Sequence, residues 1–93
     1  MYAVFGVSEI DTSRLTEADR LLEERLIPGV KQAPGFVSGT WARSKDGKEG
    51  RSAIIFESEK AARTALEAAL ERFPTDGPIT LKSASVLEVR TQI

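Results

Sequence analysis

Residues 33–41 read Ala33-Pro34-Gly35-Phe36-Val37-Ser38-Gly39-Thr40-Trp41, and they mark the point where a helical segment ends and a strand begins. Gly35 allows the chain to reverse direction at low steric cost. The segment Phe36 to Arg43 then has the aromatic and β-branched content that is typical of a strand. The polar segment Ser44 to Gly50 follows and contains the turn dipeptide Asp46-Gly47, which predicts a hairpin leading to the next strand.

Four strands are predicted around this hairpin. They cover residues Tyr2–Val7, Phe36–Arg43, Arg51–Glu57 and Ile79–Val89. A helical segment separates each outer strand from the hairpin, so the order of elements is β-α-β-β-α-β. This order predicts one α+β, ferredoxin-like domain over residues 1–93, with a four-stranded antiparallel sheet and two helices on one face.

The two helices are predicted from apolar residues at helical spacing. Ile10 to Ser13 supplies N-cap candidates for the first helix, and Ile27-Pro28 should end or kink it, because proline disfavours α geometry in the residue before it. Pro28 can start a further short turn that runs to Gln32. Ser58 is the predicted N-cap of the second helix, which Pro74 to Pro78 closes. The predicted buried stripes are Leu15, Ala18, Leu21, Leu22 and Leu26 in the first helix, and Ala62, Leu66, Ala69, Leu70 and Phe73 in the second.

Composition excludes several classes of function. Thirteen basic and 14 acidic residues leave a net charge of −1, which provides no basic field for nucleic acid or for an anionic membrane. On the third strand, Arg51 and Ala53 stand where the stacking aromatics of an RNA-binding sheet belong. The start of the chain, Met1 to Val7, has neither the basic residues of a signal peptide nor the length of a membrane span. With no cysteine either, we expect a cytoplasmic protein whose partners include neither nucleic acid nor membrane.

The strands carry apolar residues on both faces of the predicted sheet. The first strand alternates Tyr2, Val4 and Gly6 with Ala3, Phe5 and Val7; the third sets Ile54 and Phe56 against Ala53 and Ile55; the fourth sets Leu81, Leu87 and Val89 against Ala84 and Val86. Two helices can cover only one face, and a sheet with one wet face should alternate cleanly between apolar and polar residues. We therefore expect a homodimer in which the second face packs on the sheet of another copy. Which face meets the helices is left open by the sequence.

Three segments carry a family resemblance. They are Tyr2-Ala3-Val4-Phe5 in the first strand, Ala33-Pro34-Gly35-Phe36 at the entry to the second, and Ile54 to Ala62 from the third strand into the second helix. With these segments the chain resembles the dimeric α/β-barrel superfamily, most closely the antibiotic-biosynthesis-monooxygenase-like proteins, over essentially its whole length. The resemblance implies a barrel of two sheets packed face to face, with room for a small ligand between the sheet and the helices of each subunit.

The resemblance implies no catalytic residue for this chain. In that family, cofactor-free oxidation of aromatic polyketides, and haem breakdown in a sister branch, use Asn, Trp and either His or Tyr around the pocket. This chain contains no Asn and no His. Its single Trp, Trp41, lies in the second strand, whereas the family's catalytic Trp comes later in the chain. We accordingly predict no cofactor.

The candidate ligand-binding residues are Trp41, Arg43 and Tyr2. Trp41 and Arg43 share one face of the second strand with Val37 and Gly39, and Gly39 leaves a gap that a ligand or a side chain can fill. A Trp beside an Arg can stack on a planar, acidic molecule and orient it. The alternative is that Trp41 packs at the dimer interface with Arg43 at its rim. Tyr2, the sole phenol, can donate or accept a proton or can simply pack.

Glu9 and Asp11 are the one pair of carboxylates placed to hold a metal, but helix capping by Asp11 is the simpler interpretation, and we predict no metal. The sequence thus predicts a protein that binds a small apolar or aromatic ligand without a recognisable catalytic constellation. The alternative is a cofactor-independent monooxygenase or isomerase that acts on a small aromatic or enolisable substrate.

Overall fold

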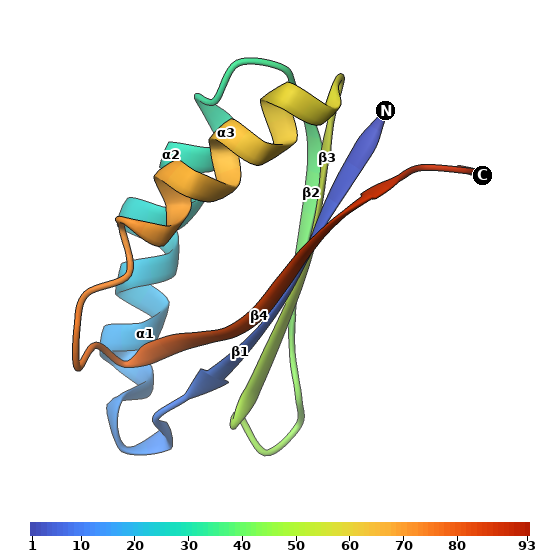
Figure 1. Ribbon diagram of the computed structural model, residues 1–93. Helices are drawn as coiled ribbons and strands as arrows, with labels where there is room; N and C mark the ends of the chain where they lie inside the picture. The colour runs from blue at the N-terminus through green and yellow to red at the C-terminus, as the bar shows by residue number, and fades with distance from the viewer.

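A four-stranded antiparallel sheet with a layer of helices on one face makes up the computed structural model, which describes residues 1–93 (Figure 1). The strands are β1 (Tyr2–Ile10), β2 (Phe36–Arg43), β3 (Glu49–Phe56) and β4 (Ile79–Glu88), in the spatial order β2-β3-β1-β4. This arrangement confirms the predicted ferredoxin-like fold. The predicted bounds were short at two points, since β1 runs on past Val7 to Ile10 and β3 begins at Glu49, before the predicted Arg51. β3 and β4 each end one residue earlier than predicted.

The first helical segment stays helical through Pro28. It consists of a 3₁₀ turn η1 (Thr12–Arg14), helix α1 (Leu15–Leu21), a π turn η2 (Leu22–Leu26) and helix α2 (Ile27–Lys31). Proline lacks an N–H to donate, and its ring clashes with the carbonyl one turn earlier. The wider π turn directly before Ile27 relieves that clash, so the predicted irregularity takes the form of a π turn and not of a helix end.

Helix α3 (Glu59–Leu70) begins where the sequence predicts. The Ser58 hydroxyl oxygen accepts a hydrogen bond from the Ala61 N–H at 3.1 Å, which caps the first turn. The helix ends at Leu70, so Phe73, which was predicted to continue its buried stripe, lies in the turn that follows. Two further members of the predicted stripes are exposed. Leu70 is 51% exposed and Leu15 is 36% exposed, because each lies at the edge of its helix's apolar arc.

Two register shifts decide which side chains face the helices. A bulge between Phe36 and Ser38 places Phe36 on the same face as Gly39, Trp41 and Arg43, where strict alternation had wrongly placed Val37. A second shift, between Val7 and Ser8 on β1, brings Leu81 to the helix-facing side of β4, where strict alternation had grouped it with Leu87. The prediction for Leu81 is therefore wrong. The alternation of apolar and polar residues could not show which side chains face the helices, because each bulge shifts the following side chains to the opposite face of the sheet.

The buried side chains form two separate clusters between the sheet and the helices. One contains Val4, Val30, Ile54, Phe56, Ala62 and Ala65. The other contains Ile10, Ala18, Leu21, Leu26 and Ile79. The first clamps α3 and α2 against the middle of the sheet, and the second holds the π turn and α1 near the end of β1. No helix combines the length and the apolar character needed to cross a membrane.

Candidate functional site

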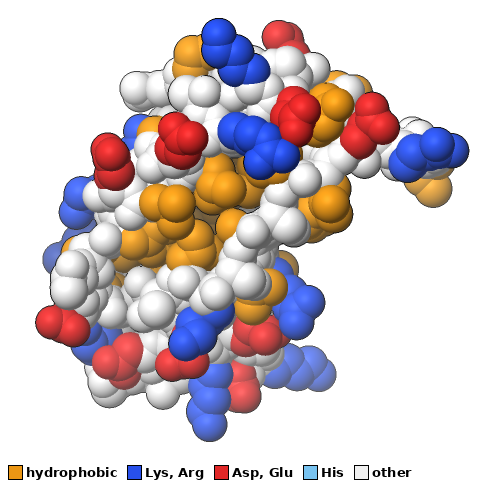
Figure 2. Space-filling view, viewed as in Figure 1, with side chains coloured by type: hydrophobic (Ala, Val, Ile, Leu, Met, Phe, Trp, Pro, Cys, Tyr) orange, Lys and Arg blue, Asp and Glu red, His pale blue; other side chains and the backbone are white.

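A cavity of about 370 Å³ lies between the two buried clusters, enclosed by the sheet on one side and by the helices on the other. Of its 25 lining residues, 17 are hydrophobic, so the interior favours an apolar occupant. Figure 2 shows the surface hollowed between α3 and β4, with hydrophobic side chains gathered inside the hollow. Ala84 lines the cavity on β4 and is itself exposed, which places an opening at this edge.

The space exists because small residues face each other across it. Two neighbouring rows of the sheet form its floor: Trp41, Ser52, Gly6 and Ala84 in one row, and Arg43, Gly50, Ser8 and Leu81 in the next. In both rows the two central strands contribute only glycine and serine. On the helical side the lining includes Ala18, Ala65 and Ala69. With no bulky side chain reaching in from either layer at this level, the interior stays open.

Trp41 lies at the β2 end of the cavity, and Gly39 determines how its ring is placed. A Cβ atom built on Gly39 would stand 2.8 Å from two ring carbons of Trp41 and 3.6 Å from a ring carbon of Phe36. The indole therefore lies back over Gly39, towards Phe36 and the first cluster, and forms a wall of the cavity. The gap predicted at Gly39 is thus filled by Trp41.

Arg43 also lines the cavity, and it faces the helical layer. Its guanidinium donates a hydrogen bond to the Asp19 carboxylate on α1 at 2.8 Å. This is the one ion pair in the structure that joins the sheet to the helices. Glu23, from the π turn, is the second carboxylate in the lining, and it makes neither an ion pair nor a side-chain hydrogen bond.

Tyr2 lies elsewhere. Its half-buried ring packs against the first cluster and is not part of the cavity wall. The structure therefore brings Trp41 and Arg43 together at one end of the cavity and separates Tyr2 from them. Sequence reasoning missed Asp19, Glu23 and Ser52, because charged and small polar residues on a helix and a strand give no local sign that a cavity adjoins them.

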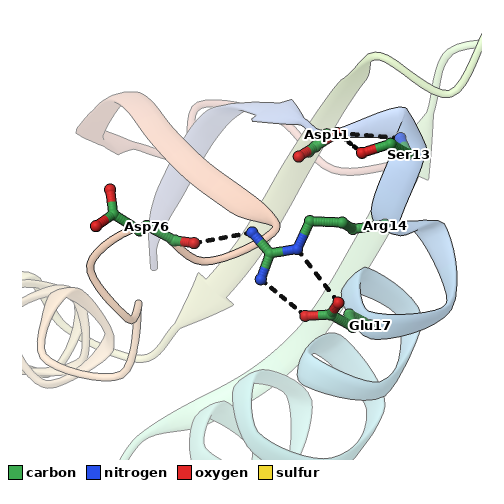
Figure 3. Close-up of polar contacts among 5 residues, drawn as sticks. All are labelled: Asp11, Ser13, Arg14, Glu17 and Asp76. Atoms are coloured by element: carbon green, nitrogen blue, oxygen red, sulfur yellow. Dashed lines mark hydrogen bonds and ion pairs between the residues drawn. The ribbon is translucent and has the colours of Figure 1, made fainter.

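Glu9 and Asp11 do not converge on a common point. Glu9 forms an ion pair with the Lys82 ammonium at 3.9 Å. Asp11 accepts hydrogen bonds from the Ser13 hydroxyl at 2.6 Å and the Ser13 N–H at 3.0 Å, and so caps η1 (Figure 3). These bonds hold the pKa of Asp11 below its ordinary value.

A polar contact beside this cap ties the helical layer to the β4 entry. Arg14 donates to the Asp76 carbonyl at 2.8 Å and to the Glu17 carboxylate at 2.8 Å (Figure 3). The hydrogen bond between the Arg14 and Glu17 side chains raises the pKa of Arg14 and lowers the pKa of Glu17. Because Arg14 and Glu17 are both paired within the fold, we interpret these contacts as structural.

No family model matches the chain, and no curated protein matches it. Solved structures do share its fold. A structure of the heme-degrader MhuD from Mycobacterium tuberculosis, with two hemes bound in its active site, aligns over 100% of this chain and 99% of that one, at 17% identity and a TM-score of 0.73.

Two Streptomyces proteins are similar in the same way. SnoaB from Streptomyces nogalater, a cofactor-independent oxygenase, aligns over 99% of this chain and 96% of its own at 18% identity and a TM-score of 0.71. The ActVA-Orf6 monooxygenase of Streptomyces coelicolor, in complex with nanaomycin D, covers 99% and 89% respectively at 20% identity and a TM-score of 0.63. This chain therefore has the fold of the antibiotic-biosynthesis-monooxygenase-like proteins, as the sequence resemblance predicts.

Proposed function

We propose that this protein binds a small apolar or aromatic molecule in the cavity between its sheet and its helices. The observation that carries the proposal is the cavity itself: about 370 Å³ with a mainly hydrophobic lining, a size within the range of known ligand sites. Protein interiors are otherwise packed about as densely as organic crystals. A void of this size would forfeit many dispersion contacts if it were never filled.

Binding is tested by closing the opening between α3 and β4. Ala84 is exposed and faces the cavity, so Ala84→Phe adds a ring at the opening in a residue type that strands favour. The matched control is Ser83→Phe, one residue earlier and outside the cavity lining. The probe is phenylnaphthylamine, a neutral molecule that fluoresces when it leaves water.

We expect the wild type and Ser83→Phe to bind the probe with similar affinity, and Ala84→Phe to bind it at least about tenfold more weakly, which is about 1.4 kcal/mol. Trp41, the only tryptophan, gives an independent readout because it forms part of the wall. Equal probe affinity in all three proteins would refute the proposal.

A second candidate function is that of a cofactor-independent monooxygenase or isomerase. The likeness to SnoaB, itself described as a cofactor-independent oxygenase, favours it at the level of fold. The chemistry would begin with removal of a proton from an enolisable aromatic substrate. Glu23 would be the base, since the other carboxylate in the lining, Asp19, is paired with Arg43. Oxygen uptake with an enolisable aromatic ketone such as anthrone tests this candidate. Uptake by the wild type that Glu23→Gln abolishes would support it, and uptake equal to the buffer blank would exclude that substrate class.

We also propose that the chain forms a homodimer through the sheet face that carries no helices. Phe5 is 44% exposed and Leu87 is 54% exposed on this face, and Val7, Ala53 and Ile55 lie half-buried beside them. A contiguous apolar patch of this kind is typical of an interface, and stable interfaces bury about 800 Å² on each partner.

Sedimentation equilibrium at micromolar concentration tests the dimer. We expect twice the chain mass of 10.1 kDa for the wild type and a single chain mass for Phe5→Lys. Leu70→Lys is the matched control, because Leu70 is as exposed as Phe5 but lies on α3, away from the sheet face. A monomeric wild type would refute the proposal.

A further inference from the structure

We propose that the ligand of this cavity carries an anionic group and that Arg43 binds it, with Asp19 as the partner that the ligand replaces. This inference rests on the proposed binding function and adds the chemical class of the ligand. It follows from the uneven distribution of charge along the cavity, from the hydrogen-bonding capacity of the Arg43 guanidinium and from the exposure of its present partner.

The two ends of the cavity differ in chemistry. At the end between α3 and β4 the lining is uncharged and includes Leu66, Ala69, Phe73 and Ala84. The charged lining residues are Arg43, Arg51, Asp19 and Glu23, which come from β2, β3, α1 and the π turn. Of the two arginines, Arg51 is paired with Glu49 on its own strand, and Arg43 faces α1. A ligand that fills the cavity therefore has its apolar body under α3, and any charged group it carries meets the β2 end.

Arg43 has unused capacity to bind an anion. A guanidinium has five N–H donors in a planar fork, and the structure records one of them in a hydrogen bond, from the terminal nitrogen to Asp19. The remaining donors match the two oxygens of a carboxylate or sulfonate.

Asp19 can be replaced as the partner of Arg43. The side chains of the ion pair are 43% and 49% exposed, so water screens their attraction and either partner can exchange. Exchange with an anionic ligand leaves Arg43 neutralised, and the freed Asp19 carboxylate turns to solvent. A cationic ligand would instead have to displace Arg43 from Asp19 or bind to Glu23, which is exposed and hydrated.

The experiment compares two probes with the same aromatic skeleton, anionic anilinonaphthalene sulfonate and neutral phenylnaphthylamine. We expect Arg43→Gln to weaken binding of the anionic probe by about three- to tenfold and to change binding of the neutral probe by less than about twofold. We expect Asp19→Asn, which removes the competing carboxylate, to strengthen binding of the anionic probe by about two- to fivefold. The opposite signs distinguish ligand binding by Arg43 from mere loss of a structural ion pair, since both variants lose the pair.

Control variants make each outcome decisive. Arg63→Gln breaks an exposed ion pair with Glu59 outside the cavity and should leave both probes unaffected. Arg43→Lys keeps the charge and should retain part of the preference for the anionic probe even if Arg43→Gln folds poorly. If Asp19→Asn weakens the anionic probe, or if Arg43→Gln weakens both probes equally, the inference is overturned while the binding proposal stands. If the neutral probe is insensitive to Ala84→Phe, the binding proposal fails and this inference fails with it.

Discussion

Replacement of Gly35 by alanine should destabilise the fold strongly, for two separable reasons. Gly35 has a φ of +82°, and a Cβ atom built on it would stand 2.8 Å from the Ala61 Cβ on α3. The backbone conformation costs an L-residue about 1–2 kcal/mol. The contact adds about 1–3 kcal/mol, because two Cβ atoms have no rotamer by which to move apart. Alanine also lowers the conformational entropy of the unfolded chain, which by itself would stabilise the fold by about 0.4–1 kcal/mol.

The expected loss in the free energy of unfolding is therefore about 2–4 kcal/mol, which corresponds to a fall in Tm of about 10–25 °C for a domain of this size. Gly47→Ala is the matched control. Gly47 has a φ of +78°, but its nearest neighbour to a built Cβ is a Leu15 methyl carbon at an ordinary 3.6 Å. It carries the conformational cost without the contact and should lose only about 1 kcal/mol.

Urea unfolding of the two single variants, of Ala61→Gly and of the Gly35→Ala/Ala61→Gly double variant completes a double-mutant cycle. Ala61→Gly alone should cost about 1 kcal/mol of helix propensity. In the Gly35→Ala background it should instead recover stability, with a coupling energy of about 1–3 kcal/mol. Equal losses for Gly35→Ala and Gly47→Ala, with no coupling to Ala61, would refute the close packing of the β2 entry against α3.

Three further predictions concern the site and the surface. Gly39→Ala should push the Trp41 ring out of its place over the strand, which shifts tryptophan emission and weakens phenylnaphthylamine binding by about tenfold; unchanged emission would contradict the described ring position. Ser58→Ala should lower the free energy of unfolding by about 1 kcal/mol by removing the α3 cap, whereas Ser58→Asp should retain most of it, as measured in urea. Asp46 accepts hydrogen bonds from the Lys48 N–H and the Ser44 hydroxyl, which hold its pKa below the ordinary 3.8. A carboxyl whose folded pKa is lowered stabilises the fold above its unfolded pKa and loses that contribution as the pH falls through its folded pKa. Tm should therefore drop between about pH 5 and pH 2. Asp46→Asn should make this drop shallower.

Sequence reasoning identified the architecture well because the strongest signals here are local. The turn at Asp46-Gly47, the Ser58 cap and the reversal at Gly35 each depend on one residue's backbone or side-chain chemistry, and each is found where it was predicted. The side-chain facing of β2 and β4 could not be predicted, because one inserted residue at a bulge inverts the alternation. The π turn before Pro28 was missed for a similar reason: the apolar spacing of a helix barely changes when one turn widens.

The candidate site lies where both kinds of irregularity occur together. The bulge at the start of β2 turns Trp41 and Arg43 towards the helices, and the π turn places Glu23 opposite them. Between these elements, Gly6 and Ser52 are neighbours across β1 and β3, where a well-packed sheet would carry two larger apolar side chains. A Cβ on Gly6 would come within 2.8 Å of the Ser52 hydroxyl oxygen, so even this pair is closely fitted at its base while the space above it stays open. Gly6 and Gly50, the β2 bulge and the π turn each weaken the regular sheet or helix to which they belong, and a binding role would give these four features a common physical reason.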